Sequence, residues 1–206
     1  MTDKFHPKAT PATVAPSHGV DKRLMLQSRW LSWLFFGLFL AASAEVALWV
    51  FAMLFRVGSV AGMQNGGFAL VLPLPPLHET LSPYFIPVSS LPLWQSMLAT
   101  VLLAARLLPG LFILWHLRTL FRLYSQGKVF SPDNARQIRL IAFALLGYAA
   151  VPFFTHGVLF LVDMTTTVIK MEIRQADALM LGLVLLTMAR VMKFGHEIES
   201  DREGFV

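Results

Sequence analysis

The sequence predicts an all-α integral membrane protein with four transmembrane helices, both termini in the cytoplasm and a long first external loop. Hydrophobic residues make up 56% of the chain and charged residues only 14%, a balance too apolar for an ordinary soluble domain. The apolar residues gather in long stretches, and basic residues gather in the short segments beside them. The chain contains no cysteine, so disulfides, thiol catalysis and thiolate metal sites are excluded.

Four apolar stretches are long enough, or nearly so, to cross a bilayer, which takes about 20 residues of helix. They are Leu31 to Phe55, Leu93 to Leu117, Ile138 to Val162 and a shorter fourth from Ala176 to Met192. The first stretch has a competing interpretation as a secretory signal peptide, because Ala42-Ser43-Ala44 is similar to a cleavage site. Its apolar run continues to Phe55, which favours a retained helix.

The distribution of basic residues predicts how these helices are oriented. Five lysines and arginines precede the first stretch, and five lie around the connection between the second and third. The first connection carries only Arg56, and the third only Lys170 and Arg174. By the positive-inside rule, both termini and the second connection face the cytoplasm, in a multi-pass protein of the bacterial inner membrane. Topology thereby explains the net charge of +5, and no direct contact with nucleic acid is expected.

The chain divides into a tail and a membrane domain. Residues 1–28 are expected to be a disordered cytoplasmic tail, because prolines are frequent near the start and no hydrophobic period is present there. Residues 29–206 form the four-helix transmembrane domain. Its last helix is expected to continue past the membrane as a cytoplasmic extension over residues 193–206, because a helical apolar stripe persists there.

The two longer connections differ in character. The external loop 56–92 is rich in glycine and proline yet apolar, so we expect it to pack over the bundle or to enter the membrane interface. In the cytoplasmic turn 118–137, Gly127 marks the end of one helix. The next helix is predicted to begin with Ser131 as its N-cap and Pro132 at its first position.

Two charged residues interrupt the apolar stretches, Glu45 in the first and Arg106 in the second. A charge at the bilayer centre costs about 2.5–3.5 kcal/mol or more, so both side chains should face protein or water. Their depths below the cytoplasmic ends are about 21 and 16 Å at 1.5 Å per residue. We therefore predict that Glu45 and Arg106 pair inside the bundle. The pair either holds the helices in register or forms a site for a proton, an ion or an anionic ligand.

No arrangement of residues indicates catalysis, a cofactor or a metal. His196-Glu197 lacks the second histidine of a zinc-protease motif. His116 and His156 are expected near opposite faces of the membrane, which argues against a haem held between them. The sequence therefore predicts a protein that is not an enzyme, with no catalytic residues, no cofactor and no metal.

The run from Leu120 to Arg136, with Gly127-Lys128-Val129-Phe130-Ser131 at its centre, resembles a bacterial membrane family catalogued as domain of unknown function 2975. The segment from Ala189 to Asp201 is similar to that family's closing helix. The resemblance covers roughly residues 29 to 206 and implies four helices, with no established activity. The ending Asp201-Arg202-Glu203-Gly204-Phe205-Val206 departs from the family's glutamate-rich tail. Related genes often lie beside helix-turn-helix regulators, which implies such a regulator as a cytoplasmic partner.

These observations favour a non-enzymatic membrane sensor or regulator whose cytoplasmic face binds a partner. The expected interaction surface consists of Arg118, Arg122, Lys128, Arg136, Arg139, Glu197 and Glu199. The competing interpretation of these residues is contact with headgroups of the lipid bilayer alone. The alternative function is a small transporter or ion-conducting protein that uses Glu45 and Arg106. That function requires a homo-oligomer, because four helices enclose little water.

Overall fold

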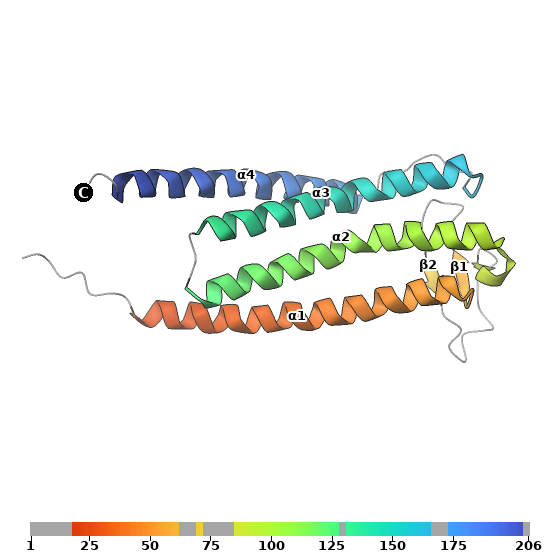
Figure 1. The fold of residues 1–206 in the computed structure, drawn as a ribbon, viewed down its shortest axis with the longest axis horizontal. Coiled ribbons are helices and arrows are strands. Elements are labelled where there is room, and N and C mark those ends of the chain that lie inside the picture. Colours follow the sequence, from red (N-terminus) through yellow and green to blue (C-terminus); the bar gives the residue numbers. More distant parts are fainter. Residues whose placement is uncertain (1–17, 62–68, 72–84, 128–130, 166–172, 204–206) are drawn as a thin grey trace, which may run out of the picture.

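Four long helices dominate the computed structural model, which describes residues 18–61, 69–71, 85–127, 131–165 and 173–203 (Figure 1). The helices are α1 (His18–Leu54), α2 (Leu93–Ser125), α3 (Pro132–Leu161) and α4 (Ile173–Glu203). All four contain a stretch that is long and apolar enough to cross a membrane. The prediction of an all-α, multi-pass membrane protein with four transmembrane helices is therefore confirmed.

The helices pack in chain order as an open row. The closely packed pairs are α1 with α2, α2 with α3 and α3 with α4, so that α1 and α4 occupy the outer positions (Figure 1). The start of α1, the end of α2, the start of α3 and the end of α4 all lie at the same end of the row. We call this the basic end. This arrangement agrees with two termini on one side of the membrane, whereas the identity of that side stays a prediction. Large apolar side chains cover the outside, among them Trp30, which is 72% exposed.

A small sheet lies at the opposite end, which we call the sheet end. Its strands β1 (Ser59–Ala61), β2 (Ala69–Val71) and β3 (Phe85–Pro87) pair antiparallel in the order β2-β1-β3. The central residue Val60 faces Leu70 on one side and Ile86 on the other. This sheet was not expected from the sequence. It pairs backbone groups of the described parts of the apolar loop 56–92.

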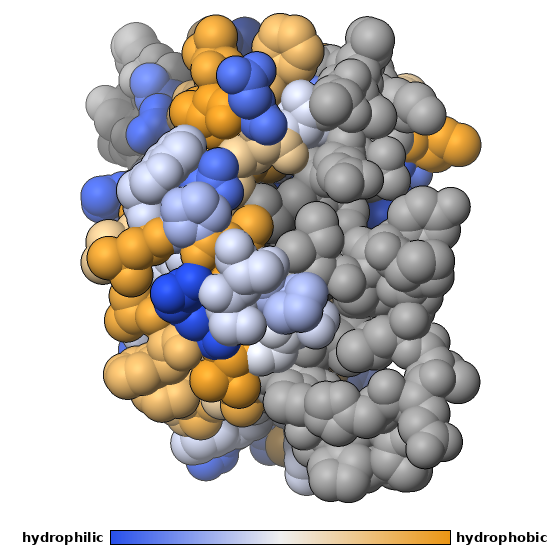
Figure 2. Space-filling model, turned by 90° about the vertical axis from the view of Figure 1, so that its right-hand side faces the viewer, coloured by the Kyte–Doolittle hydropathy of each residue, from blue (hydrophilic) through white to orange (hydrophobic). Residues whose placement is uncertain are grey.

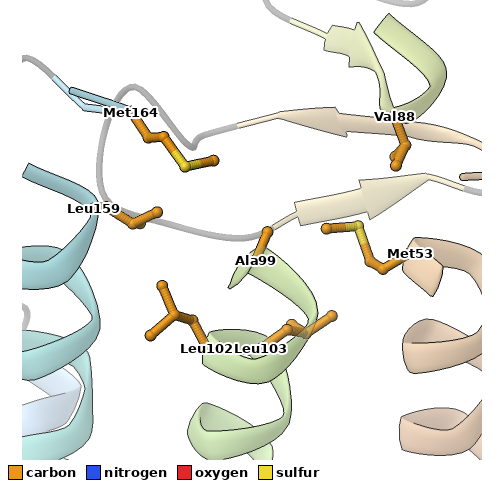
Figure 3. Packing of buried hydrophobic residues seen from close by; sticks show 7 residues of the cluster. All are labelled: Met53, Val88, Ala99, Leu102, Leu103, Leu159 and Met164. Atoms are coloured by element: carbon orange, nitrogen blue, oxygen red, sulfur yellow. The ribbon is translucent and has the colours of Figure 1, made fainter. Parts of the chain in front are cut away.

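One described residue of the loop, Val88, packs into the bundle, which agrees with the first of the two expectations for this loop. Val88 lies in a short 3-10 helix (Val88–Ser90) and is fully buried among side chains of α1, α2 and α3 (Figure 3). The cluster consists of Met53, Val88, Ala99, Leu102, Leu103, Leu159 and Met164. Viewed from the sheet end, the surface around this core mixes hydrophilic and hydrophobic residues (Figure 2). Such a mixture suits a surface that leaves the hydrocarbon layer.

Two helices at the sheet end close in the same way. Arg56 after α1 and Asp163 after α3 adopt left-handed φ values of 58° and 54°. The next residue in each case donates a backbone hydrogen bond back to the helix, Val57 to Ala52 and Met164 to Leu159. This is the Schellman arrangement, which satisfies helix carbonyls and reverses the chain. The Arg56 side chain also donates to the Ser89 and Leu91 carbonyls, which ties the loop to α1.

The turn at the basic end follows the prediction closely. Gly127 adopts a φ of 77°, and the Ser131 side chain accepts a hydrogen bond of 3.4 Å from the Asn134 backbone N–H. Pro132 occupies the first turn of α3. Within the cytoplasmic connection predicted over 118–137, α2 continues to Ser125 and α3 begins at Pro132. Both helices extend beyond the apolar stretches, because many residues there have a high helix propensity.

Helices α1 and α4 also extend beyond their apolar stretches at this end. The helix α1 begins at His18, so the tail predicted over residues 1–28 is wrong for residues 18–28, where Lys, Arg, Leu, Met and Gln support a helix. Residues 1–17 lie outside the described part. The predicted extension of the last helix is confirmed as far as Glu203. Residues 204–206 lie outside the described part.

Candidate functional site

The antiparallel pair α1 and α2 brings Glu45 and Arg106 to about the same depth. On one side of them, the rings of Phe39 and Trp115 pack with centroids 5.3 Å apart. On the other side, the Ser96 hydroxyl donates a 2.8 Å hydrogen bond to the Met53 carbonyl. Glu45 and Arg106 both lie between these two cross-helix contacts, which supports the depth estimate from the sequence.

Glu45 lines a cavity of about 430 Å³ to which all four helices contribute. We call this space the Glu45 cavity. Ala42, Val46 and Trp49 share the face of α1 with Glu45, because they follow the helical spacing of three and four residues. Leu107 and Gly110 of α2, Leu145 and Tyr148 of α3 and Ala178 of α4 complete most of its wall. Among the described residues that line this cavity, Glu45 carries the only charge.

Arg106 lines a different and much smaller cavity, which we call the arginine cavity. Its volume is about 70 Å³, and its walls are Arg106, Tyr148, Pro152, Arg174 and Gln175. Tyr148 lines both cavities and lies between them. Because the two charged side chains face different cavities, the pairing of Glu45 with Arg106 stays a prediction.

The arginine cavity shows that α4 begins deep inside the row of helices. Pro152 lies nine residues before the end of α3 at Leu161 (161 − 152 = 9), which is about 14 Å along the helix. Arg174 and Gln175, in the first turn of α4, line the cavity with Pro152, so α4 starts at that level. Figure 1 shows the resulting displacement of α4 toward the basic end. Sequence reasoning missed Arg174 and Gln175, because their level depends on this displacement.

Arg118 was predicted to belong to the partner-binding surface, and the structure places its guanidinium beside two aromatic rings. Its guanidinium carbon lies 3.8 Å from the centre of the Phe36 ring and 5.2 Å from that of Trp115. Its backbone carbonyl accepts a hydrogen bond of 3.3 Å from the Ser32 hydroxyl. The contact with Phe36 joins α2 to α1, whereas Trp115 lies one turn before Arg118 on α2 itself.

A wide groove opens between α3 and α4 at the basic end. Its volume is about 650 Å³, and four positive side chains line it, Arg136 and Arg139 from α3 and Arg190 and Lys193 from α4. Apolar residues form the rest of the wall, namely Pro132, Ala135, Phe143, Leu186, Ala189 and Phe194. We call this the basic groove. Arg136 and Arg139 were predicted as surface residues, whereas Arg190 and Lys193 were missed.

A spacing signal for the two missed residues is present in the sequence. Arg190 and Lys193 are three positions apart, as Arg136 and Arg139 are, and this spacing places each pair on one helix face. The antiparallel packing of α3 on α4 then brings the two faces together. Only this packing shows that the pairs line one groove.

The remaining predicted surface residues are less informative. Arg122 is exposed near the end of α2. Lys128 lies outside the described residues, and so do the side chains of Glu197 and Glu199, whose backbone belongs to α4. Their expected part in a partner-binding surface stays a prediction.

The histidines of the membrane domain have separate surroundings. His116 Nδ1 lies 2.8 Å from the Gln137 side-chain oxygen, which links α2 to α3, and His156 is buried in α3. In the described part of the chain, no three His, Cys, Asp or Glu residues form a group that could hold a metal ion.

Comparison with known proteins places the chain in a family. No curated protein and no solved structure matches the chain. The family described as protein of unknown function (DUF2975) matches residues 29–204. This range includes all of α2, α3 and α4, most of α1, both cavities and the basic groove. The chain therefore belongs to this family of proteins of unknown function, as the turn between its second and third helices had indicated.

Proposed function

We propose that this protein is a non-enzymatic membrane sensor or regulator that binds a soluble cytoplasmic protein in the basic groove. The observation that carries the proposal is the juxtaposition of four cationic side chains with an apolar wall at the end of the bundle where α1 begins and α4 ends. The excess of basic residues at this end favours a cytoplasmic location by the positive-inside rule.

The chemistry of the groove favours an acidic, amphipathic segment as its occupant. The basic side chains attract carboxylates and orient the partner, while Phe143 and Phe194 offer apolar contact area. An amphipathic helix carries both features on adjoining faces and fits a groove between two helices. Small helix-turn-helix regulators, implied by the family resemblance, are candidates for such a partner.

The position of the groove supports a soluble partner over lipid headgroups. Pro132, Ala135 and Arg136 precede the apolar stretch of α3, which starts at Ile138, so we expect the outer part of this wall to lie beyond the hydrocarbon layer. The helix α4 continues for ten residues beyond Lys193, to Glu203 (203 − 193 = 10). The last part of α4 therefore extends past the groove, where a soluble protein can contact it.

Co-purification from native membranes tests the proposal. The wild-type chain is compared with a groove variant carrying Arg136→Gln, Arg139→Gln, Arg190→Gln and Lys193→Gln. A control removes three exposed charges from the start of α1 at the same end, through Lys22→Gln, Arg23→Gln and Arg29→Gln. We expect a stoichiometric soluble protein with wild type and control, and at least about tenfold less with the groove variant. The recovered protein is then purified and its binding measured directly at two salt concentrations.

Two results would overturn the proposal. One is equal recovery of the partner with the groove variant, which would place the contact elsewhere. The other is recovery of anionic phospholipid in place of any soluble protein, lost only in the groove variant. That result would identify the groove as a headgroup site.

Transport is a second candidate function, favoured by the Glu45 cavity. A carboxylate at mid-span that lines an open cavity is a feature of proton and ion pathways. The chain in proteoliposomes should then conduct protons or cations, and Glu45→Gln should abolish the flux. An unchanged flux in that variant would exclude a pathway through Glu45.

A further inference from the structure

The Glu45 cavity exists because the row of helices is not closed. In a closed four-helix bundle the first and last helices pack together, whereas here the packed pairs among the described helices are only the consecutive ones. The cavity is lined by α1 and α4, the two outer helices, as well as by α2 and α3. Its volume of about 430 Å³ falls in the range of sites for small organic molecules.

The lining of the cavity specifies a positive charge in its occupant. Glu45 is the one charged residue among the described lining residues, and the surrounding side chains are mainly aliphatic or aromatic. A carboxylate in such surroundings is strongly stabilised by a cation, whereas lipid tails supply no countercharge. Glu45 lies nine residues from the end of α1 at Leu54 (54 − 45 = 9), about 14 Å from the sheet end.

The lining also specifies an apolar body for the occupant. Trp49 lies one turn beyond Glu45 on the same face of α1, and Tyr148 lines the cavity from α3. Aromatic rings attract organic cations through their π faces, most strongly where water is excluded. The aliphatic residues Val46 and Leu107 offer contact to hydrocarbon groups. A hydrated metal ion would use neither kind of contact.

From this combination we infer that the Glu45 cavity is a binding site for lipophilic organic cations, such as hydrophobic amines and quaternary ammonium or phosphonium compounds. Glu45 supplies the countercharge, Trp49 and Tyr148 contact the cationic centre, and the aliphatic wall holds the apolar substituents. The inference does not depend on the basic groove. For a membrane sensor, such compounds would be the signal, because they partition into membranes.

Equilibrium binding of tetraphenylphosphonium tests this site. The full chain is placed in nanodiscs of phosphatidylcholine, and the bound probe is measured against empty nanodiscs. We expect saturable binding by wild type and a loss of affinity of about tenfold or more in Glu45→Gln. Tetraphenylborate, an anion of the same shape, should show no saturable binding to the chain. Asp163→Asn is the matched control, because it removes an exposed carboxylate at the sheet end and Asn also tolerates its left-handed backbone.

A second variant keeps the charge and fills the space. Gly110 lines the cavity, and a β-carbon added there would meet no atom within 4 Å, so we expect the side chain of Gly110→Leu to occupy part of the cavity. We expect this variant to unfold at the wild-type temperature and to lose tetraphenylphosphonium binding with Glu45 intact. Thermal unfolding of both variants separates loss of the site from loss of the fold.

Three results would overturn the inference. They are no saturable phosphonium binding by wild type, equal binding by the phosphonium and the borate, and wild-type affinity in Glu45→Gln. The last result is also the outcome expected if Arg106 neutralises Glu45 across the helix interface. The groove variant tests the basic groove alone. If it loses partner binding and still binds the phosphonium, the inference about the Glu45 cavity is unaffected.

Discussion

At the sheet end, α1 and α3 close through left-handed residues, and the connecting loop seals a core in which Val88 and Leu159 are fully buried. At the basic end, the helices instead run on past the apolar stretches to different lengths, and the space between α3 and α4 is an open groove lined by cations. The core of that end is smaller and consists of Leu120, Ile138, Ile141 and Ala189. One end therefore has the features of a stable closure and the other those of a contact surface.

This difference predicts how mutations at the two ends act. Changes in the closed core should lower the free energy of unfolding most, because buried atoms lose packing contacts that nothing replaces. Changes in the turn at the basic end should have smaller effects on unfolding. The charge substitutions in the basic groove should affect partner binding with little loss of stability, because exposed charges contribute little to the folded state.

The largest loss of stability is expected for Leu159→Ala at the sheet end. The side chain is fully buried in the core shown in Figure 3, so its truncation leaves a cavity. We expect a loss of about 2–4 kcal/mol in the free energy of unfolding, measured by denaturant titration in detergent micelles. Leu161→Ala is the control, because that side chain is 82% exposed and should change stability by about 0.5 kcal/mol or less. Equal losses in both variants would contradict a closed core at this end.

An intermediate effect is expected for Gly127→Ala in the turn at the basic end. Gly127 has a φ of 77°, which costs a residue with a side chain about 1–2 kcal/mol. A β-carbon there would also lie 2.9 Å from the Met25 methyl group, which can move because it ends a flexible and exposed side chain. Gly127→Asn should lose less, since Asn tolerates this backbone conformation. If Asn destabilises as much as Ala, the contact with Met25 dominates.

The smallest effect is expected for Ser131→Ala at the start of α3. The Ser131 hydroxyl caps the helix through a hydrogen bond of 3.4 Å, which is long, so we expect a loss of about 0.5–1 kcal/mol. Ser131→Asp should retain most of the stability, because a carboxylate accepts the same hydrogen bond and favours the positive helix end. A loss above that of Gly127→Ala would reverse the expected order and show that the cap controls the turn.

Local rules account for the parts of the fold that the sequence predicted well. The second helix begins at Leu93 as expected, and Gly127 and Ser131 end and begin helices where their conformational preferences require it. The sheet between α1 and α2 was missed, because strands of three residues carry little periodic signal. They form only by pairing with segments that are distant in the sequence. The early start of α1 was missed because prolines nearby suggested a tail.

The residues of the candidate sites also differ in whether the sequence alone identifies them. Glu45, Arg106, Arg136 and Arg139 stand out in the sequence, because charge in or beside an apolar stretch is unusual. Arg190 and Lys193 join them only through the packing of α3 on α4. Arg118 has the same sequence character as its basic neighbours, yet in the structure its guanidinium lies beside the rings of Phe36 from α1 and Trp115 from α2.

The sequence by itself determined that four helices cross a membrane and at what depth Glu45 and Arg106 lie, because the length of an apolar run and the helical rise are local properties. The tertiary structure alone decided which way each charge faces. The rotation and displacement of a helix depend on packing against its neighbours, and α4 is displaced toward the basic end. That packing places the carboxylate in an open apolar cavity and the arginine in a small polar one, at a similar depth.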